Sequence, residues 1–363
     1  MESSKGHKVA AGAGLTVAGL LAYLLLWPVP AEPVTWSPQQ APGYVGEHAP
    51  NTKLAGLQKI DIGVEQGPEH IAMGPDGKLY AAVASGNILR MAPDGSQREV
   101  FVNTGGRVLG FDFDANGRLV AADAMKGLLA ITPDGKITPL TAKVADKDPI
   151  RYADGVVVAP DGMIYFTDAS TRFAPAEWGG TFEASVLDIL EQSSTGRVLA
   201  YNPATGKTSI LASGLSFANG IALSGDGRTL FVNETGRYRI WKIDTASGKR
   251  SILFDNLPGY PDNLMRGRDG KIWVGLVKPR NPTIDKLAGK PFMRKLTLRL
   301  PRAMWPVPKA YGHVFAFSED GKVLADLQDP AGVYPETTAV LETADRLYIQ
   351  SLHAGYIGWM PHP

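Results

Sequence analysis

The feature that most constrains the fold is a short turn followed by a β-rich run, which recurs along most of the chain. A Pro-Asp-Gly turn opens four copies: GPDGKLYAAV (74–83), APDGSQREVFV (92–102), TPDGKITPL (132–140) and APDGMIYFTD (159–168). Looser copies follow at 114–123, 224–234, 267–276, 318–327 and 343–352. Asp-Gly supplies the positive φ that tight hairpin turns require, and the flanking Val, Ile, Leu and Tyr favour strands. The pattern predicts antiparallel hairpins. No long helical period separates the copies, which disfavours a βαβ architecture.

These hairpins group into six larger units. Six β-rich runs are expected as inner strands, each followed by an outer hairpin: KLYAAV, RLVAAD, MIYFTD, TLFVNE, KIWVGL and RLYIQS. Six units over residues 54–360 give about 51 residues each, close to the span of a four-stranded propeller blade. The predicted fold is therefore an all-β, six-bladed β-propeller over residues 54–363. An array of immunoglobulin-like sandwiches is the alternative, and it would need a different number of strands per repeat.

An uncharged segment precedes the repeats. Residues 9–27 follow Lys5 and Lys8, and nineteen helical residues rise about 28 Å, close to the hydrocarbon thickness of a bilayer. A cleaved signal peptide and an uncleaved anchor both fit such a run. The run is longer than a usual signal core and ends in Trp27, an interfacial residue type, which favours an N-terminal transmembrane helix within residues 1–27. The lysines then place the N-terminus in the cytoplasm and the propeller on the periplasmic, extracellular or lumenal side.

Residues 173–196 interrupt the repeats and include a short amphipathic run from Glu183 to Leu190. Two further segments lie outside the repeat pattern. Residues 28–53 contain six prolines and little apolar periodicity, so they are expected to form a linker. Residues 278–310 carry nine basic residues and one acid, Asp285. This second segment is either an extended loop with solvated basic side chains or a lid over the propeller channel that also contacts anionic lipid.

Composition excludes several classes of function. The 37 basic and 36 acidic residues give a net charge of +1, so the chain has no global attraction to nucleic acid. It contains no cysteine, which excludes thiolate metal sites and a cysteine nucleophile. The sequence also lacks a GxSxG nucleophile elbow, an HExxH zinc motif and a phosphate-binding loop.

Acidic and amide residues instead recur at one phase of the repeat, a few residues before the Asp-Gly turns. They are Glu69 in GPEHIAM, Asp154 in RYADGVVV, Asn219 in FANGIAL and the pair Asp262-Asn263 in YPDNLMR. Each alone could be an ordinary turn or capping residue. Equivalent positions of successive blades converge on the propeller axis, and converging carboxylate and amide oxygens suit Ca²⁺. The pattern therefore predicts a calcium site on the axis.

Several of these segments resemble one known family. The runs GLSFANGIALSGDG, LPGYPDNLMRGRDGKIWVG, IYFTDASTRF and LYIQSLHAGYIG are similar to those of the strictosidine-synthase-like family. That family is six-bladed and related to the gluconolactonase, senescence-marker and paraoxonase propellers. The resemblance covers roughly residues 55–360, and the N-terminal span resembles the adipocyte plasma-membrane-associated members.

The resemblance implies roles for individual residues. Glu69, Asn219 and Asp262 match the metal-binding positions of the hydrolytic relatives, and Asn263 matches a further paraoxonase ligand. Asp262 also matches their nucleophile or general base. Arg151 falls where gluconolactonases carry a substrate-contacting arginine, and Glu336 falls where plant strictosidine synthases carry their catalytic glutamate.

Two departures from the family pattern stand out. Ala153-Asp154 replaces the usual Asn-Asp of the third blade, which predicts that one amide ligand is missing unless Asp154 or a water compensates. The run VLGFDFD, at 108–114, offers no histidine of the paraoxonase type, so a histidine-dependent arylesterase mechanism is not expected.

These observations together predict a calcium-dependent hydrolase of a lactone or small ester, with Asp262 attacking the carbonyl or activating water. One alternative is a metal-independent Pictet–Spengler-type condensing enzyme that uses Glu336 as its acid and base. The other is a non-catalytic, membrane-tethered binding propeller, because a fold alone does not fix a function.

Overall fold

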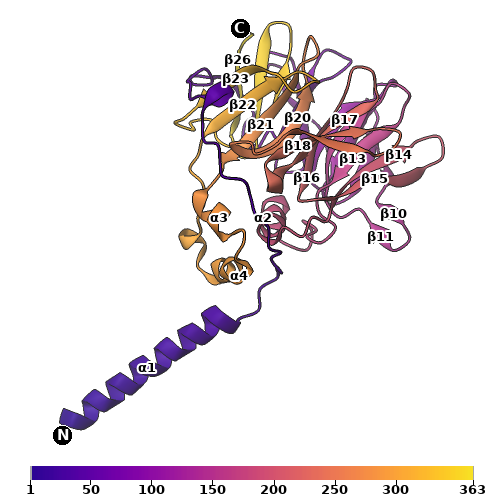
Figure 1. The fold of residues 1–363 in the computed structure, drawn as a ribbon. Helices are drawn as coiled ribbons and strands as arrows, with labels where there is room; N and C mark the ends of the chain where they lie inside the picture. The colour runs from indigo at the N-terminus through magenta and orange to yellow at the C-terminus, as the bar shows by residue number, and fades with distance from the viewer. Residues whose placement is uncertain (1, 363) are drawn as a thin grey trace.

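The computed structural model describes residues 2–362, with side chains from residue 13 onward, and its dominant feature is a ring of six four-stranded antiparallel sheets (Figure 1). The innermost strand of each sheet contacts the innermost strand of the next, and the last contacts the first, so the ring closes. The predicted six-bladed propeller is confirmed.

The strands of the first three blades follow one another in chain order. Blade 1 contains β2 (His70–Met73), β3 (Leu79–Ala82), β4 (Asn87–Met91) and β5 (Glu99–Asn103). Blade 2 contains β6 (Val108–Phe113), β7 (Leu119–Asp123), β8 (Gly127–Ile131) and β9 (Ile137–Thr141). A small ribbon of β10 (Lys143–Ala145) and β11 (Asp148–Pro149) precedes blade 3, which contains β12 (Ala153–Val158), β13 (Ile164–Asp168), β14 (Gly196–Asn202) and β15 (Lys207–Leu215).

The last three blades complete the ring. Blade 4 contains β16 (Ala218–Leu223), β17 (Thr229–Glu234), β18 (Arg239–Asp244) and β19 (Arg250–Phe254). Blade 5 contains β20 (Gly259–Arg266), β21 (Ile272–Pro279), β22 (Gly312–Phe317) and β23 (Val323–Asp329). Blade 6 combines β24 (Thr337–Glu342), β25 (Arg346–Ser351) and β26 (Tyr356–Pro361) with β1 (Gln58–Asp61).

Blade 6 joins the two ends of the propeller sequence. Strand β1 pairs antiparallel with β26, and Ile60 lies opposite Ile357. Both isoleucines are buried in an apolar cluster that also contains Tyr348. The pairing satisfies the backbone of β26, which would otherwise be an exposed sheet edge.

The innermost strand of each blade differs from the one predicted. KLYAAV forms the second strand, β3, and the innermost strand is β2, which precedes the Asp-Gly turn. The same shift applies to the other five runs, because β7, β13, β17, β21 and β25 are all second in their blades. The residues just before the turns therefore begin the strands nearest the axis.

The framework around the axis is held by apolar packing between blades and by polar side chains of the second strands. Phe231 of blade 4 packs with Val274 and Phe315 of blade 5 in one fully buried cluster. Thr167 Oγ1 donates to the carbonyl oxygen of Asn219 at 2.7 Å, and Asn233 Nδ2 donates to that of Asp262 at 2.6 Å. These hydrogen bonds fix the backbone at the start of the neighbouring innermost strands.

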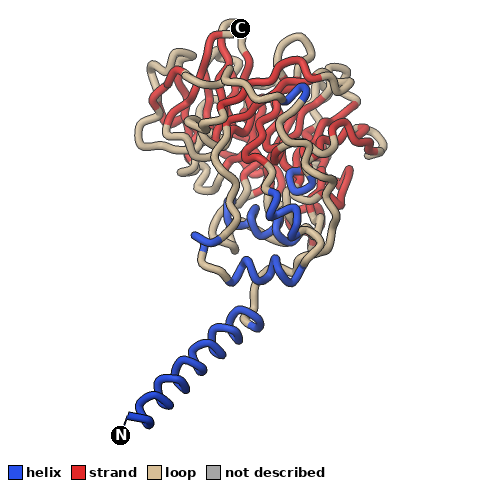
Figure 2. The backbone as a smooth tube through the Cα atoms, turned by 60° about the vertical axis from the view of Figure 1, so that its left-hand side comes forward, coloured by secondary structure: helices blue, strands red, loops and turns tan. Residues whose placement is uncertain are grey.

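Helices gather on one side of the propeller (Figure 2). They are α2 (Thr181–Glu191), α3 (Pro282–Leu287) and α4 (Pro291–Arg299), with short 3₁₀ turns at 235–237 and 302–304. A further 3₁₀ turn, at 46–48, packs against β23. Residues 28–53 run along the propeller, where the amide of Val34 donates to the Glu191 carbonyl oxygen at 2.8 Å. In the 278–310 segment Arg280, Arg294 and Arg299 are buried. The expectation of solvated basic side chains is therefore wrong for these three residues.

Helix α1 (Glu2–Leu26) extends away from the propeller beneath α4 (Figures 1 and 2). Arg299 of α4 donates to the carbonyl oxygens of Trp27 and Leu24, at 2.7 and 3.1 Å, and so binds the C-terminal end of α1. Part of the predicted membrane span over residues 9–27 belongs to the residues whose side chains the structure does not describe. Among the described residues no helix is long and apolar enough to cross a membrane, so the transmembrane helix is not shown.

Candidate active site

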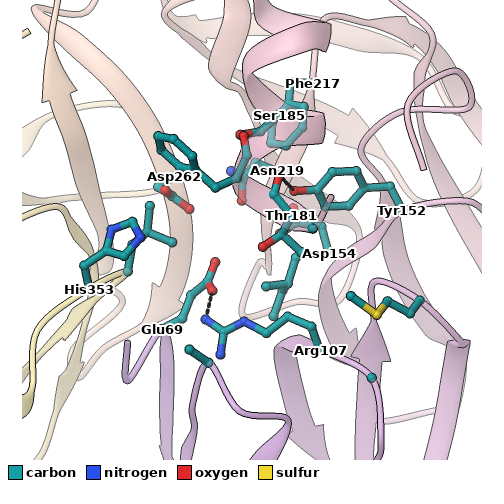
Figure 3. A pocket seen from close by; sticks show the side chains of 17 residues that line it. Glu69, Arg107, Tyr152, Asp154, Thr181, Ser185, Phe217, Asn219, Asp262 and His353 are labelled. Carbon is teal, nitrogen blue, oxygen red and sulfur yellow. Dashed lines mark hydrogen bonds and ion pairs between the residues drawn. The ribbon is translucent and has the colours of Figure 1, made fainter. Parts of the chain in front are cut away.

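A pocket of about 230 Å³ lies on the propeller axis, at the end of the channel that α2 faces (Figure 3). Its apolar wall includes Leu109, Phe217 and Leu352. Its polar lining consists of Glu69, Arg107, Tyr152, Asp154, Asn219, Asp262 and His353, together with Thr181 and Ser185 of α2.

Four of these side chains, those of Glu69, Asp154, Asn219 and Asp262, stand at the same structural position of blades 1, 3, 4 and 5. Leu109 occupies that position in blade 2, and Arg107 stands two residues before it. Glu69 precedes β2, Arg107 precedes β6, and Asp154, Asn219 and Asp262 lie near the starts of β12, β16 and β20. The structure thus brings together Glu69, Asp154, Asn219 and Asp262, as their common repeat phase indicates.

Local backbone geometry explains why these residues face the axis. The pairing register of β12, β16 and β20 shifts at the start of each strand, at Ala153, Ala218 and Pro261. Such β-bulges redirect side chains. Glycine follows two of the pocket residues: a Cβ at Gly155 would lie 3.0 Å from the Asn219 carbonyl oxygen, and one at Gly220 would lie 2.5 Å from that of Asp262. In each pair the Asp or Asn side chain places an oxygen in the pocket, and the glycine after it allows the backbone of the next blade to approach closely.

The pocket holds three buried carboxylates against one guanidinium. Arg107 forms an ion pair with Glu69, and both side chains are buried. Burial raises the pKa of Glu69 although Arg107 acts to lower it. Burial and the charges of Glu69 and Asp262 raise the pKa of Asp154 well above its ordinary value. Burial and Glu69 likewise raise the pKa of Asp262 well above its ordinary value, against a hydrogen bond from Asn219.

This lining fits a divalent cation. When the carboxyl groups of Glu69, Asp154 and Asp262 are all ionised, they carry three negative charges. Arg107 carries one positive charge, which leaves an excess of two negative charges between these four residues. Within the described part of the chain, Asp154 Oδ1 and Asn219 Oδ1 are buried and have no hydrogen-bond partner. Buried oxygens without partners are costly unless a ligand satisfies them, and hard cations such as Ca²⁺ prefer oxygen ligands. The residues present therefore suit calcium.

The substitution at Ala153 does not remove a group from this pocket. Ala153 is buried in an apolar cluster with Val120 and Phe166, between blades 2 and 3. The neighbouring Asp154 lines the pocket. The expectation that alanine leaves a gap among the ligands is wrong, because the side chain at 153 points into the interblade core.

Three other predicted residues lie beside the pocket rather than among its lining residues. Asn263 is buried and its Nδ2 donates to the Glu69 carbonyl oxygen at 3.0 Å. Arg151 pairs with Glu177 at 2.5 Å. Glu336 pairs with Lys278 at 2.5 Å and bonds to the ring of His353. None of the three lines the pocket, so no contact there supports their predicted roles as metal ligand, substrate contact and catalytic acid.

Sequence reasoning missed Arg107 and His353. Arg107 had no repeat signal, because it stands two residues before the blade 2 position that is equivalent to Glu69, where the sequence has Leu109. His353 had none, because it follows β25 on a loop between outer strands. The amphipathic run at 183–190 marks the insertion in blade 3 and forms α2, but no repeat places Phe182 and Ser185 at the pocket.

The closed ring and the oxygen-lined axial pocket define a six-bladed β-propeller with a candidate cation site. Residues 46–91 match the N-terminal region of strictosidine synthase-like proteins, and residues 78–288 match the SMP-30/gluconolactonase/LRE-like region. The chain belongs to the strictosidine synthase-like family within these propellers.

Relatives extend over nearly the whole chain. Strictosidine synthase-like protein 6 of Arabidopsis thaliana is 33% identical over 341 residues, covering 90% of this chain and 86% of the relative. The adipocyte plasma membrane-associated protein of Salmo salar is 30% identical over 374 residues, covering 95% and 87%.

Solved structures share the fold. A gluconolactonase from Xanthomonas campestris superposes with a TM-score of 0.62 at 20% identity, covering 92% of this chain and 99% of the other. A calcium-binding regucalcin from Agrobacterium tumefaciens gives a TM-score of 0.56 at 14% identity, covering 84% and 93%. At these identities the likeness concerns the fold alone.

Proposed function

We propose that the protein is a calcium-dependent hydrolase of a lactone or another small ester. The observation that carries the proposal is the set of three buried carboxyl groups and one buried amide oxygen around a single pocket, beside the one guanidinium of Arg107. The match of residues 78–288 to the SMP-30/gluconolactonase/LRE-like region supports the same chemistry.

Glu69, Asp154, Asn219 and Asp262 are the residues that would hold the ion. When bound, Ca²⁺ supplies positive charge that polarises the substrate carbonyl and stabilises the oxyanion that develops there. Arg107 holds Glu69 in its orientation through the ion pair. Asp262 takes a proton from the attacking water, so that the water oxygen adds to the carbonyl carbon.

The pocket selects for small substrates. A cavity of about 230 Å³ is smaller than most pockets that bind drug-sized ligands, about 300–1,000 Å³. Leu109 and Phe217 provide apolar surface beside the polar groups, and Phe182 of α2 contributes a further apolar side chain. An ester or lactone has this mixed character, with one polar carboxyl group on an otherwise less polar skeleton.

The condensing-enzyme alternative is not favoured. It required Glu336 as an acid and base in contact with substrate, but Glu336 is not a pocket-lining residue and its carboxylate is occupied by Lys278 and His353.

The decisive variant for this proposal is Asp262→Asn, which keeps the size of the side chain and removes its capacity to accept a proton. We expect the parent to hydrolyse members of a panel of five- and six-membered lactones and phenyl acetate in Ca²⁺, and the variant to lose about 10²–10⁴-fold in kcat. Asp161→Asn, at an exposed blade turn, is the matched control. Undiminished turnover by a folded Asp262→Asn variant would exclude the mechanism.

We also propose that the protein associates with a membrane through α1 and the neighbouring surface of α4, with the propeller on the periplasmic, extracellular or lumenal side. Leu26, Trp27, Phe292, Met293 and Met304 are exposed apolar side chains in this region. Arg299 links α4 to the end of α1. Relatives named adipocyte plasma membrane-associated protein support the assignment.

Vesicle flotation tests this association. The full chain is expected to float with lipid vesicles and to stay with them through an alkaline carbonate wash. Complete release by the wash would contradict anchoring by α1.

A further inference from the structure

His353 stands at the edge of the axial pocket with one ring nitrogen committed and the other available. Its Nδ1 bonds to the carboxylate of Glu336. Across the described residues no hydrogen-bond partner is found for its Nε2. The ring lies near Glu69 and Asp262 at the pocket margin (Figure 3). Because a carboxylate accepts only from a protonated nitrogen, Glu336 fixes the proton on Nδ1 and leaves Nε2 for the pocket.

The Glu336 carboxylate is itself held firmly. Lys278 of β21 pairs with Glu336 Oε1 at 2.5 Å, while the other oxygen accepts from His353. The backbone of Glu336 has a φ of 52°, a left-handed conformation that is uncommon for a residue other than glycine. The amide of Leu352 donates to its carbonyl oxygen at 3.1 Å, which ties Glu336 to the loop that carries His353.

The loop itself is also fixed. Ser351 Oγ accepts from the amides of His353 and Ala354, at 3.3 and 3.0 Å, and donates to the Pro335 carbonyl oxygen at 2.6 Å. The ring of Phe182, from α2, meets the His353 ring edge to face at a centroid distance of 5.7 Å. The imidazole is thus oriented from blade 6 and from α2 together.

Ester hydrolysis needs a proton donor, and Glu69 and Asp154 cannot supply the proton when they bind the ion in their ionised forms. The proton that Asp262 takes lies on the water side of the carbonyl, and the guanidinium of Arg107 is committed to Glu69. Tyr152 donates its hydroxyl proton to the Thr181 carbonyl oxygen at 2.8 Å. An alkoxide leaving group, as in a lactone, is a strong base and needs protonation as the carbon–oxygen bond breaks.

We propose that His353 is the general acid of the hydrolase reaction proposed above, and that Glu336 is its positioning residue. As the bond between carbonyl carbon and alkoxy oxygen breaks, its electron pair moves to the alkoxy oxygen, which takes the proton of His353 Nε2. Asp262 then releases to the solvent the proton that it took from water, and His353 takes up a proton from the solvent. Both side chains return to their starting states. The sum is ester plus water giving acid plus alcohol. The inference rests on the proposed function.

The hydrogen bond to Glu336 also raises the pKa of His353 above its ordinary value, with the nearby charge of Glu69 acting in the same direction. This shift favours the protonated ring that a general acid requires.

Leaving-group dependence tests this role with the full-length protein in Ca²⁺. His353→Gln is expected to lose about 10²-fold or more in kcat on an alkyl lactone, whose leaving oxygen needs a proton. The same variant should keep its rate on p-nitrophenyl acetate within a few-fold, because p-nitrophenolate leaves unprotonated. Glu336→Gln should show the same selectivity with a smaller loss, and Glu336→Asp should recover part of it. Glu319→Gln, a carboxylate at the blade 4 and 5 periphery, is the control.

The outcomes separate the two proposals. An equal loss on both substrates, or no loss on the lactone, would overturn the role of His353 while leaving the hydrolase intact. Absence of turnover by the parent on both substrates would overturn the hydrolase and this role with it. Calcium titration and thermal unfolding of each variant identify any loss that comes from misfolding or from ion binding.

Discussion

The guanidinium of Arg107 forms an ion pair with the carboxylate of Glu69 inside the axial pocket, where both side chains are almost fully buried. The pair satisfies one carboxylate, and in the described part of the chain Asp154 and Asp262 form no ion pair. The charge balance of the pocket therefore depends on one arginine and on what binds beside it.

Replacing Arg107 by methionine should make folding more dependent on calcium. Removal of one partner from a buried ion pair costs about 3–5 kcal/mol, because the other charge stays buried. A bound divalent ion would offset part of that cost, so the rise in Tm between EGTA and saturating Ca²⁺ should be larger for Arg107→Met than for the parent. Scanning calorimetry in both conditions measures it.

Arg90→Met is the control for this experiment, since Arg90 pairs with Glu99 at 2.8 Å on the surface. Surface ion pairs contribute about 0–1 kcal/mol to stability, so Ca²⁺ should raise the Tm of Arg90→Met by as much as it raises the Tm of the parent. An equal calcium-induced shift in Arg107→Met and in the parent would show that the arginine does not share its site with the ion.

Calcium binding should release protons. The pKa values of Asp154 and Asp262 are raised by burial and by neighbouring negative charge, so these groups hold protons more readily when no cation is present. Metal binding requires the ionised form, so affinity should increase with pH. Calorimetric titration at one pH in two buffers of different ionisation enthalpy measures the released protons directly. Identical apparent enthalpies in the two buffers would contradict the expected proton release.

Glu342 should contribute stability that disappears in acid. Its buried carboxylate accepts from Lys271 at 2.7 Å, Trp273 Nε1 at 2.8 Å and the amide of Arg268 at 3.1 Å. Burial acts to raise its pKa, but these bonds and one from His362 outweigh burial and lower it to about 2. A pKa below the unfolded value stabilises the folded state above about pH 4.5, and this stability is lost as pH falls toward 2.

The variant Glu342→Gln should therefore lose about 2–3 kcal/mol of unfolding free energy at pH 7 and much less near pH 2.5. Urea unfolding at the two pH values measures the difference, with the exposed Glu47→Gln as control. A loss of the same size at both pH values would point to packing rather than to the carboxylate charge.

The sequence predicts the repeat well because the repeat is local. Asp-Gly turns and their flanking β-branched residues depend on neighbours in sequence, and the phase of Glu69, Asp154, Asn219 and Asp262 follows from the blades. The six runs expected as innermost strands lie one strand further from the axis. The Asp-Gly turn joins the first and second strands of a blade, and local pattern does not reveal which of the two lies nearer the axis.

Other parts of the pocket depend on contacts that local pattern does not encode. Whether position 153 or 154 faces the axis depends on a β-bulge in β12, which the alternation of residues alone does not reveal. His353 reaches the pocket from a loop of blade 6 and is oriented by Glu336 across seventeen residues of sequence. Phe182 and Ser185 come from an inserted helix whose position depends on tertiary packing.

The central claim is that the axial pocket binds a divalent cation, and a calorimetric Ca²⁺ titration of the full chain tests it most directly, beside Asp154→Ala and Asp161→Ala. The parent and Asp161→Ala should each bind one ion in a saturable manner, and Asp154→Ala should bind at least about tenfold more weakly, since it loses a charged ligand. Absence of binding by a folded parent, or equal affinity in all three proteins, would contradict the account.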